Sequence, residues 1–177
     1  MHPHHHAKTN PDKPAYIMAG SGETVTYGQL EARSNQVAHA MRGAGCKPGD
    51  TIALFAENSP RYFEICWGAQ RAGLYYVAIS SRLTAPEVEY ILSDSGAKLF
   101  IAGASKRAVA EEVKALTNLE HYWSIDGPMP GFAPLETLRG AFPETPIADQ
   151  MAGTDMLYSS GTTGRPKGIR PALEPDM

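Results

Sequence analysis

The residues whose types and spacing most clearly suggest chemistry lie in the stretch YSSGTTGRPKG, from Tyr158 to Gly168. This short segment brings together hydroxyl side chains, glycines and one lysine. Glycine lets backbone N–H groups come close to an anion, while hydroxyls and an ammonium group complete a cradle around it. The segment is therefore predicted to bind phosphate.

Two other ways of holding a phosphate can be excluded by counting. Neither Gly161 nor Gly164 is followed at the required distance by the Gly-Lys-Ser/Thr of a Walker loop. The segment should not open a helix either, because Pro166, Pro171 and Pro175 obstruct one. Hydroxyls, backbone amides and the lysine must then hold the phosphate. The alternative is an ordinary exposed turn between two strands.

Composition limits the class of protein. The chain has 177 residues, 42% of them hydrophobic and 20% charged, which suits a single globular domain with a sizeable core. A net charge of −3 does not indicate binding to nucleic acid or to an anionic membrane. No apolar run reaches the ~20 residues of a membrane-spanning helix, and the start lacks the apolar core of a signal peptide. We expect a cytoplasmic protein with a small-molecule ligand.

The cysteines and the clustered histidines predict no metal site. Cys46 and Cys66 lie in apolar segments without CxxC spacing, which predicts two buried, reduced thiols. The opening MHPHHHA has four histidines between residues 2 and 6. Metal ligands must be held in a fixed geometry, and this end of the chain is expected to be an unstructured terminus or an interrupted purification tag. We assign these histidines no function.

Apolar runs with the character of strands alternate with helical patterns along the chain. Such alternation predicts an α/β fold: a largely parallel sheet with flanking helices, joined by right-handed crossovers. Strands are expected at 15–18, 23–27, 51–56, 74–79, 98–103, 121–125 and 156–158, and helices at 27–43, 60–72, 85–95, 105–116 and 134–142. The predicted phosphate-binding segment thus follows a strand, at the kind of sheet edge where ligands usually bind.

Three helix starts are predicted from capping residues. Thr26 with Gln29, and Thr84 with Glu87, have the spacing of a capping box. Ser59 is a good N-cap residue in front of the proline at position 60.

The segment SSGTTGRPKG resembles the phosphate-binding signature of the AMP-forming adenylating superfamily, which includes acyl- and aryl-CoA synthetases, luciferases and the adenylation domains of peptide synthetases. Upstream, NPDKPA and the long run from TYGQLEARSN to LYYVAI are similar to the family's N-terminal region in order and spacing. The resemblance extends from about Ala7 to Arg170. It implies that the chain is part of the N-terminal domain of an acyl-adenylate-forming enzyme.

Such enzymes join a carboxylic acid to ATP, release pyrophosphate and transfer the acyl group from the adenylate to a thiol, so the resemblance implies ATP, Mg²⁺ and coenzyme A. Charge builds up on the phosphoryl oxygens and on the departing pyrophosphate, and donors directed at them stabilise the transition state. The implied cofactor-binding residues are Ser159, Ser160, Gly161, Thr162, Thr163, Gly164 and Lys167. Thr163 and Lys167 are the catalytic candidates, whereas Arg165 is expected to be a solvated charge.

Family members are much longer than this chain, which ends just after its first signature. The resemblance therefore implies an N-terminal fragment, with a tail at 1–14, an α/β subdomain at 15–170 and a truncated tail at 171–177. The GIRP after Lys167 resembles certain fatty acyl-CoA synthetases and favours an aliphatic acid. A peptide-synthetase adenylation domain and a non-catalytic interaction module remain the alternatives. Apolar surface and a strand edge uncovered by the truncation predict a homo-oligomer.

Overall fold

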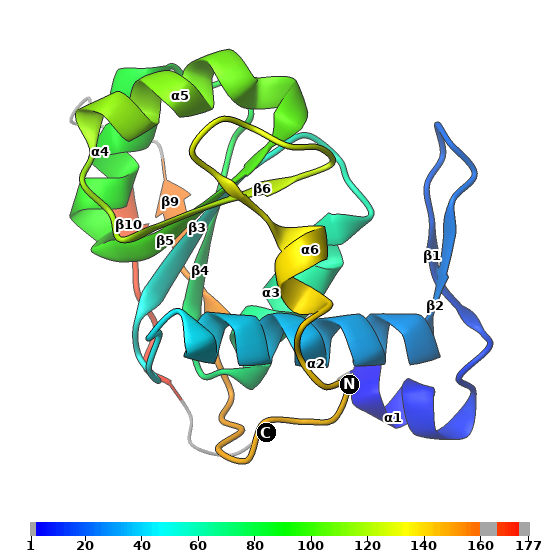
Figure 1. Ribbon diagram of the computed structural model, residues 1–177. Helices are drawn as coiled ribbons and strands as arrows, with labels where there is room; N and C mark the ends of the chain where they lie inside the picture. Colours follow the sequence, from blue (N-terminus) through cyan, green and yellow to red (C-terminus); the bar gives the residue numbers. More distant parts are fainter. Residues whose placement is uncertain (1–2, 160–165, 174–177) are drawn as a thin grey trace.

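The computed structural model describes residues 3–159 and 166–173 of the chain, in which strands and helices alternate (Figure 1). The helices are α1 (Pro3–Thr9), α2 (Tyr27–Gly43), α3 (Arg61–Arg71), α4 (Ala85–Ser95), the short 3₁₀ turn η1 (Ala104–Lys106), α5 (Arg107–Leu116) and α6 (Leu135–Arg139). The strands are β1 (Pro14–Ile17), β2 (Thr24–Thr26), β3 (Thr51–Phe55), β4 (Tyr75–Ile79), β5 (Ala97–Gly103), β6 (His121–Ile125), β7 (Ala133–Pro134), β8 (Thr154–Asp155), β9 (Leu157–Ser159) and β10 (Lys167–Ile169).

The centre of the fold is a parallel sheet, as predicted. Within the described residues its six strands lie in the order β7-β6-β5-β3-β4-β8, and each neighbouring pair is parallel. From β3 the chain moves outward to β4, returns across β3 to β5, and continues to β6 and β7. Strand order therefore reverses beside β3, and in open α/β sheets ligands bind beyond the carboxyl ends of the strands at such a reversal.

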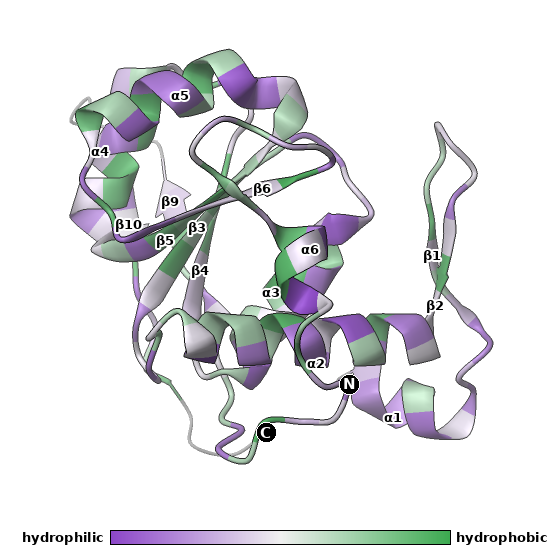
Figure 2. Cartoon of the chain, in the orientation of Figure 1, coloured by the Kyte–Doolittle hydropathy of each residue, from purple (hydrophilic) through white to green (hydrophobic). Residues whose placement is uncertain are grey.

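Two layers of helices cover the two faces of the sheet. Ile52 and Leu54 of β3 point into a core with α2, α3 and α6, while Ala53 and Phe55 point into a second core with α4 and α5. Figure 2 shows the central strands as hydrophobic and the outer surfaces of the helices as mixed. All five residues of β3 are buried, which explains why the four residues from Ile52 to Phe55 are all apolar rather than alternating with polar ones.

Both predicted capping boxes are present. Thr26 Oγ1 accepts a hydrogen bond from Gln29 N at 3.2 Å, and Gln29 Oε1 accepts one from Thr26 N at 3.0 Å. At the start of α4, the Glu87 carboxylate accepts a hydrogen bond from Thr84 N at 2.8 Å. Gly96 ends α4 in the left-handed conformation, at φ 63°.

Two predicted helix boundaries differ from the structure. The N-cap of α3 is Pro60 rather than Ser59, although Ser59 Oγ does accept a hydrogen bond from Arg61 N at 3.0 Å. The helix expected at 134–142 is shorter, because the helical residues are Leu135–Arg139.

The N-terminal histidine segment is helical, contrary to the unstructured terminus that the sequence suggested. Helix α1 packs against α2, where His4 Nδ1 lies 2.8 Å from Glu31 Oε1 and the ring of His6 lies 4.7 Å from that of Tyr27. Glu31 in turn pairs with Arg71, which is 1% exposed. The segment is thus tied to a buried charged group of α3.

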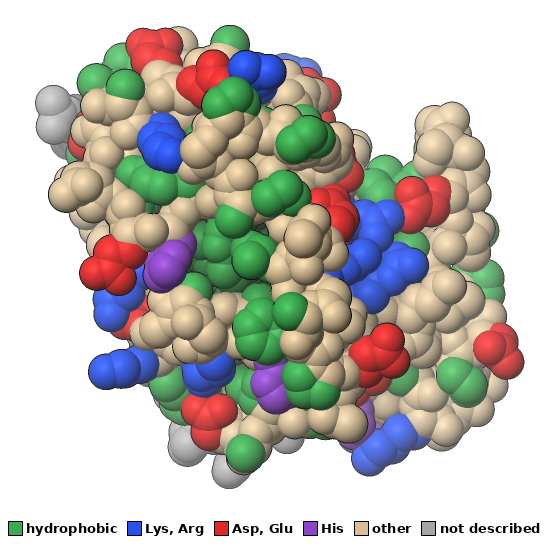
Figure 3. All heavy atoms as spheres, viewed as in Figure 1, with side chains coloured by type: hydrophobic (Ala, Val, Ile, Leu, Met, Phe, Trp, Pro, Cys, Tyr) green, Lys and Arg blue, Asp and Glu red, His purple; other side chains and the backbone are tan. Residues whose placement is uncertain are grey.

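A second charged network surrounds the fully buried carboxylate of Glu64 in α3. Arg33 of α2, Arg61 of α3 and Arg139 of α6 all bind this carboxylate, and Arg61 also binds Glu23 in the turn of the β1–β2 hairpin. Figure 3 shows basic side chains gathered beside that hairpin. Breaking such a buried pair typically costs about 3–5 kcal/mol because it leaves uncompensated charge behind. The network fixes three helices and the hairpin relative to one another.

Cys46 and Cys66 are buried and not joined in a disulfide. Burial raises the pKa of the Cys46 thiol to about 11 and that of Cys66 to about 12, so both are neutral at ordinary pH. No helix among the described residues is long and apolar enough to cross a membrane.

Candidate functional site

The predicted phosphate-binding segment begins and ends in an antiparallel hairpin. The cross-strand pairs of β9 and β10 are Leu157–Ile169, Tyr158–Gly168 and Ser159–Lys167. Side chains alternate between the faces of a strand, so Ser159 and Lys167 share one face and Tyr158 lies on the other. Both Ser159 and Lys167 are exposed. This face therefore presents a hydroxyl and an ammonium group side by side.

The structure thus brings together two of the predicted site residues. The other predicted site residues lie outside the described residues: Ser160, Gly161, Thr162, Thr163 and Gly164. Arg165 lies outside them as well. The roles given to these residues remain predictions.

The strand before this segment is not a strand of the main sheet, contrary to expectation. β8 is the edge strand beside β4 in that sheet, and β9 follows it and pairs with β10 in a separate two-stranded ladder. Met156 separates β8 from β9, and its N–H donates a hydrogen bond to Tyr76 O of β4 at 2.9 Å. The residues on both sides of the predicted segment are therefore extended, and 167–169 form a strand rather than a helix.

The hairpin lies against α4 and runs toward the carboxyl edge of the sheet (Figure 1). Tyr158 Oη donates a hydrogen bond to Asp94 Oδ2 at 2.6 Å, in the last turn of α4. Tyr90 Oη, one turn nearer the start of α4, donates to Pro166 O at 3.1 Å. Because α4 follows β4, its first turn lies at the carboxyl end of the strands. Pro166 therefore lies nearer than Tyr158 to the edge where ligands bind in such sheets.

The far end of the hairpin is fixed to β4. Tyr75 Oη donates a hydrogen bond to Pro171 O at 2.6 Å, and the Arg170 guanidinium lies 4.2 Å from the centre of the Tyr75 ring. Arg170 also donates to Gly49 O. Sequence reasoning missed Tyr75, Tyr90 and Asp94, because a contact between distant segments leaves no local pattern.

The Tyr158 side chain is held as a neutral donor. Partial burial, followed by the hydrogen bond and charge of Asp94, raises the pKa of the Tyr158 phenol above its usual range. A Cβ at Gly168 would collide with Met156 Cε and lie 3.0 Å from both Cζ and Oη of Tyr158, so a glycine fits closely against these two side chains. The glycine of the PKG sequence thus has a packing role beside the charged site.

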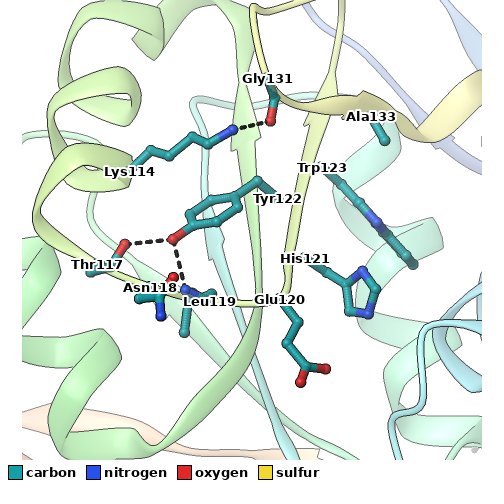
Figure 4. Close-up of a pocket in the computed structure, with 10 residues that line it drawn as sticks. All are labelled: Lys114, Thr117, Asn118, Leu119, Glu120, His121, Tyr122, Trp123, Gly131 and Ala133. Atoms are coloured by element: carbon teal, nitrogen blue, oxygen red, sulfur yellow. Dashed lines mark hydrogen bonds between the residues drawn. The ribbon is translucent and has the colours of Figure 1, made fainter.

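Several cavities lie elsewhere in the described part of the chain. One of 680 Å³ opens between the β1–β2 hairpin and the carboxyl ends of β3 and β4, with Ile17, Phe63 and Ser80 in its wall. Another, of 480 Å³, lies at the β6 edge (Figure 4). There Tyr122 Oη bonds with Thr117 Oγ1 and accepts a hydrogen bond from Leu119 N. Neither Ser159 nor Lys167, the two predicted site residues that the structure describes, lines either of these two cavities.

Comparisons with known proteins place the chain in a family. Residues 3–170 match the AMP-binding enzyme family. The chain belongs to this family. It is 36% identical, over 93% of its length, to a fatty acid–[acyl-carrier-protein] ligase of Streptomyces coeruleorubidus, and 34% identical over 92% to a long-chain-fatty-acid–CoA ligase of Mycobacterium tuberculosis. It covers 31% and 32% of those two proteins, so it spans about a third of the relatives it matches.

Solved structures of the family have the same fold. An anthranilate–CoA ligase solved with anthranoyl-AMP superposes with a TM-score of 0.85 at 29% identity, covering 94% of this chain and 33% of that one. The N-terminal domain of a Mycobacterium tuberculosis protein called FACL13 gives a TM-score of 0.82 at 30% identity, covering 94% and 42%. The α/β architecture predicted from the sequence is therefore that of the N-terminal domain of acyl-CoA ligases.

Proposed function

We propose that this chain is the N-terminal part of an AMP-forming acid–thiol ligase, and that its β9–β10 hairpin binds the β and γ phosphates of ATP. The observation that carries this proposal is the pairing of Ser159 with Lys167 on an exposed face of the hairpin. On this proposal 15–170 form the α/β portion of the enzyme.

In the first step a carboxylate oxygen attacks the α-phosphorus, the bond between the α-phosphorus and its bridging oxygen breaks, and pyrophosphate leaves. Negative charge grows on the departing group, so the Lys167 ammonium and hydroxyls such as that of Ser159 stabilise it. In the second step a thiol attacks the acyl carbon and AMP leaves. We assign Thr163 to the first step together with Lys167.

A metal ion would add positive charge at the departing phosphates. The described residues contain no group of three or more carboxylate, histidine or cysteine side chains that could hold one. On this proposal the ligands of Mg²⁺ lie in another part of the enzyme. No residue of the chain is assigned to coenzyme A.

We propose a fatty acid as the substrate, since both relatives named above act on fatty acids by their names. One of them is a ligase for acyl-carrier protein, so a carrier-protein thiol is a second candidate acceptor. Other relatives are named feruloyl-CoA synthase and 3-hydroxybenzoate–CoA ligase, so aromatic acids are a second class of candidate substrates. We place the enzyme in the cytoplasm.

The test is ATP–pyrophosphate exchange over a panel of short, medium, long and aromatic acids. The full-length protein should exchange with one class of acid, whereas this chain alone should form no acyl-AMP. The chain retains only part of the site and should bind ATP with a dissociation constant on the order of millimolar or weaker. Exchange by the isolated chain, or none by the full-length protein with any acid, would contradict the proposal.

A further inference from the structure

Both ends of the predicted phosphate-binding segment are tied to the same helix. On the incoming side, Tyr158 Oη donates to Asp94 Oδ2 at 2.6 Å, and on the outgoing side Tyr90 Oη donates to Pro166 O at 3.1 Å. Tyr90 and Asp94 are four residues apart in α4, so they lie one turn apart on the same helix face. The two ends of the segment are thus held at a spacing that a rigid helix sets.

These two hydrogen bonds act next to the groups proposed to bind phosphate. Tyr158 directly precedes Ser159, and Pro166 directly precedes Lys167. Because side chains alternate, fixing Tyr158 toward α4 turns Ser159 and its partner Lys167 to the open face. Loss of either tie would let the hydroxyl and the ammonium group rotate or shift relative to each other.

The two hydrogen bonds to α4 orient the hairpin more than they stabilise the fold. Asp94 is exposed and Tyr158 is half-buried, so water competes for this hydrogen bond. The hydrophobic contribution of α4 comes instead from Val88, Ile91 and Leu92, which are buried against the sheet. Removing the hydroxyl of Tyr90 or the charge of Asp94 should therefore leave the fold intact while changing the geometry of the hairpin.

We propose that Tyr90 and Asp94 of α4 are positioning residues for the phosphate-binding hairpin, with Tyr158 as the link that Asp94 holds. The inference rests on the proposed function and adds the elements that set the geometry of its site. It predicts a selective defect: the adenylation step involves pyrophosphate and depends on the hairpin, whereas transfer from a supplied acyl-AMP to a thiol does not.

The experiment uses the full-length protein and the variants Tyr90→Phe, Asp94→Asn and Tyr158→Phe. Exchange of pyrophosphate into ATP reports the first step, and thioester formation from synthetic acyl-AMP reports the second. A misplacement near 1 Å can lower a rate by about 10²-fold, so we expect a loss of about 10- to 100-fold in exchange and little change in the second step. Melting temperatures should stay close to that of the unchanged protein.

Two further proteins complete the design. Tyr122→Phe is the matched control, because its hydroxyl bonds with Thr117 and Leu119 instead of the hairpin, and it should exchange at the normal rate. The double variant Asp94→Asn with Tyr158→Phe should be no slower than the worse single variant, since both changes break one hydrogen bond.

The outcomes separate this inference from the function on which it rests. Normal exchange in all three α4 and Tyr158 variants, with slow exchange in Lys167→Ala, would overturn the inference and leave the proposed function standing. Equal loss in both steps together with a lower melting temperature would also overturn it, because that result means a structural role alone. If Lys167→Ala also exchanges normally, or if the unchanged protein does not exchange, both proposals are wrong.

Discussion

Gly68 of α3 and Val37 of α2 are in such close contact that the two helices could not approach each other further. A Cβ at position 68 would lie 2.6 Å from Val37 Cγ1 and 2.8 Å from Val37 Cβ, with Ser34 O at 3.2 Å. The Val37 Cβ is fixed to the backbone of its helix and cannot rotate away. The glycine therefore sets the distance between the two helices that cover one face of the sheet.

Replacing this glycine should destabilise the chain. Gly68→Ala gains up to about 1 kcal/mol in helix propensity. Because the Val37 Cβ cannot move away, overpacking should cost about 2–3 kcal/mol, the upper part of the usual range, so we expect a net loss of about 1–2 kcal/mol. Urea denaturation measures it. Gly20→Ala is the control, because no atom lies within 4 Å of a Cβ there. An equally stable or more stable Gly68→Ala protein would show that α2 and α3 can separate without cost.

The charge at the hairpin should matter for adenylation and not for folding. In the full-length protein, Lys167→Ala and Thr163→Ala should each slow adenylate formation by about one to three orders of magnitude, the usual effect of removing a donor to developing charge. Since Lys167 is exposed, its replacement should leave the melting temperature unchanged. Lys47→Ala, at an exposed turn before β3, is the matched lysine control. Exchange at the normal rate in both variants would remove this segment from the mechanism.

The contacts of Glu31 with His4 and Arg71 should make the stability of the folded chain depend on pH in the acid range. Burial alone would raise the pKa of Glu31, but hydrogen bonds from Arg71 and His4 outweigh it and hold this pKa below its ordinary 4.5. The depressed pKa stabilises the folded chain above pH 4.5, and this contribution is lost as the pH falls through the lower, folded value. Urea denaturation from pH 7 to 3 should show a smaller decline for Glu31→Gln than for the unchanged chain. Glu112→Gln, on the exposed face of α5, should decline as the unchanged chain does.

The open face of the hairpin also carries an apolar pair that should promote self-association. Leu157 and Ile169 are register partners and are 58% and 57% exposed. We propose that the isolated chain forms a homo-oligomer through this face, and that Leu157→Thr with Ile169→Thr weakens it. Light scattering at micromolar concentrations measures the assembly. Leu116→Thr removes a similarly exposed side chain from α5 and should change nothing. A monomeric unchanged chain would contradict this prediction.

Local patterns in the sequence predicted the elements and failed where the contacts are distant. The capping boxes of Thr26 and Thr84 were predictable because each involves residues three positions apart, and the buried run at 51–55 marked β3 as a central strand. Helix α1 was missed because its histidines have no apolar periodicity. Its order comes from contacts with residues of α2, including Glu31, 27 positions beyond His4.

The same distinction holds within the candidate site. The residue types from Ser159 to Lys167 indicated phosphate chemistry, but their supports could not be inferred from local sequence. Asp94 precedes Tyr158 by 64 positions and Tyr90 precedes Pro166 by 76. Neither a helix period nor a strand alternation relates such residues, so only the folded arrangement identifies α4 as the support of the hairpin.

The strand order has a consequence for biosynthesis. β8 joins the sheet beside β4 only after β5, β6 and β7 have been made, and Tyr75 must wait for Pro171, 96 positions later. A nascent chain can therefore assemble most of the sheet on the ribosome while the outer edge of β4 is still open, which is the stage at which such an edge is prone to mispairing. The β9–β10 hairpin is synthesised after all of these strands, so it can dock on α4 and β4 only once both have been made. The scaffold of the candidate site can thus be in place before the hairpin that carries its charge.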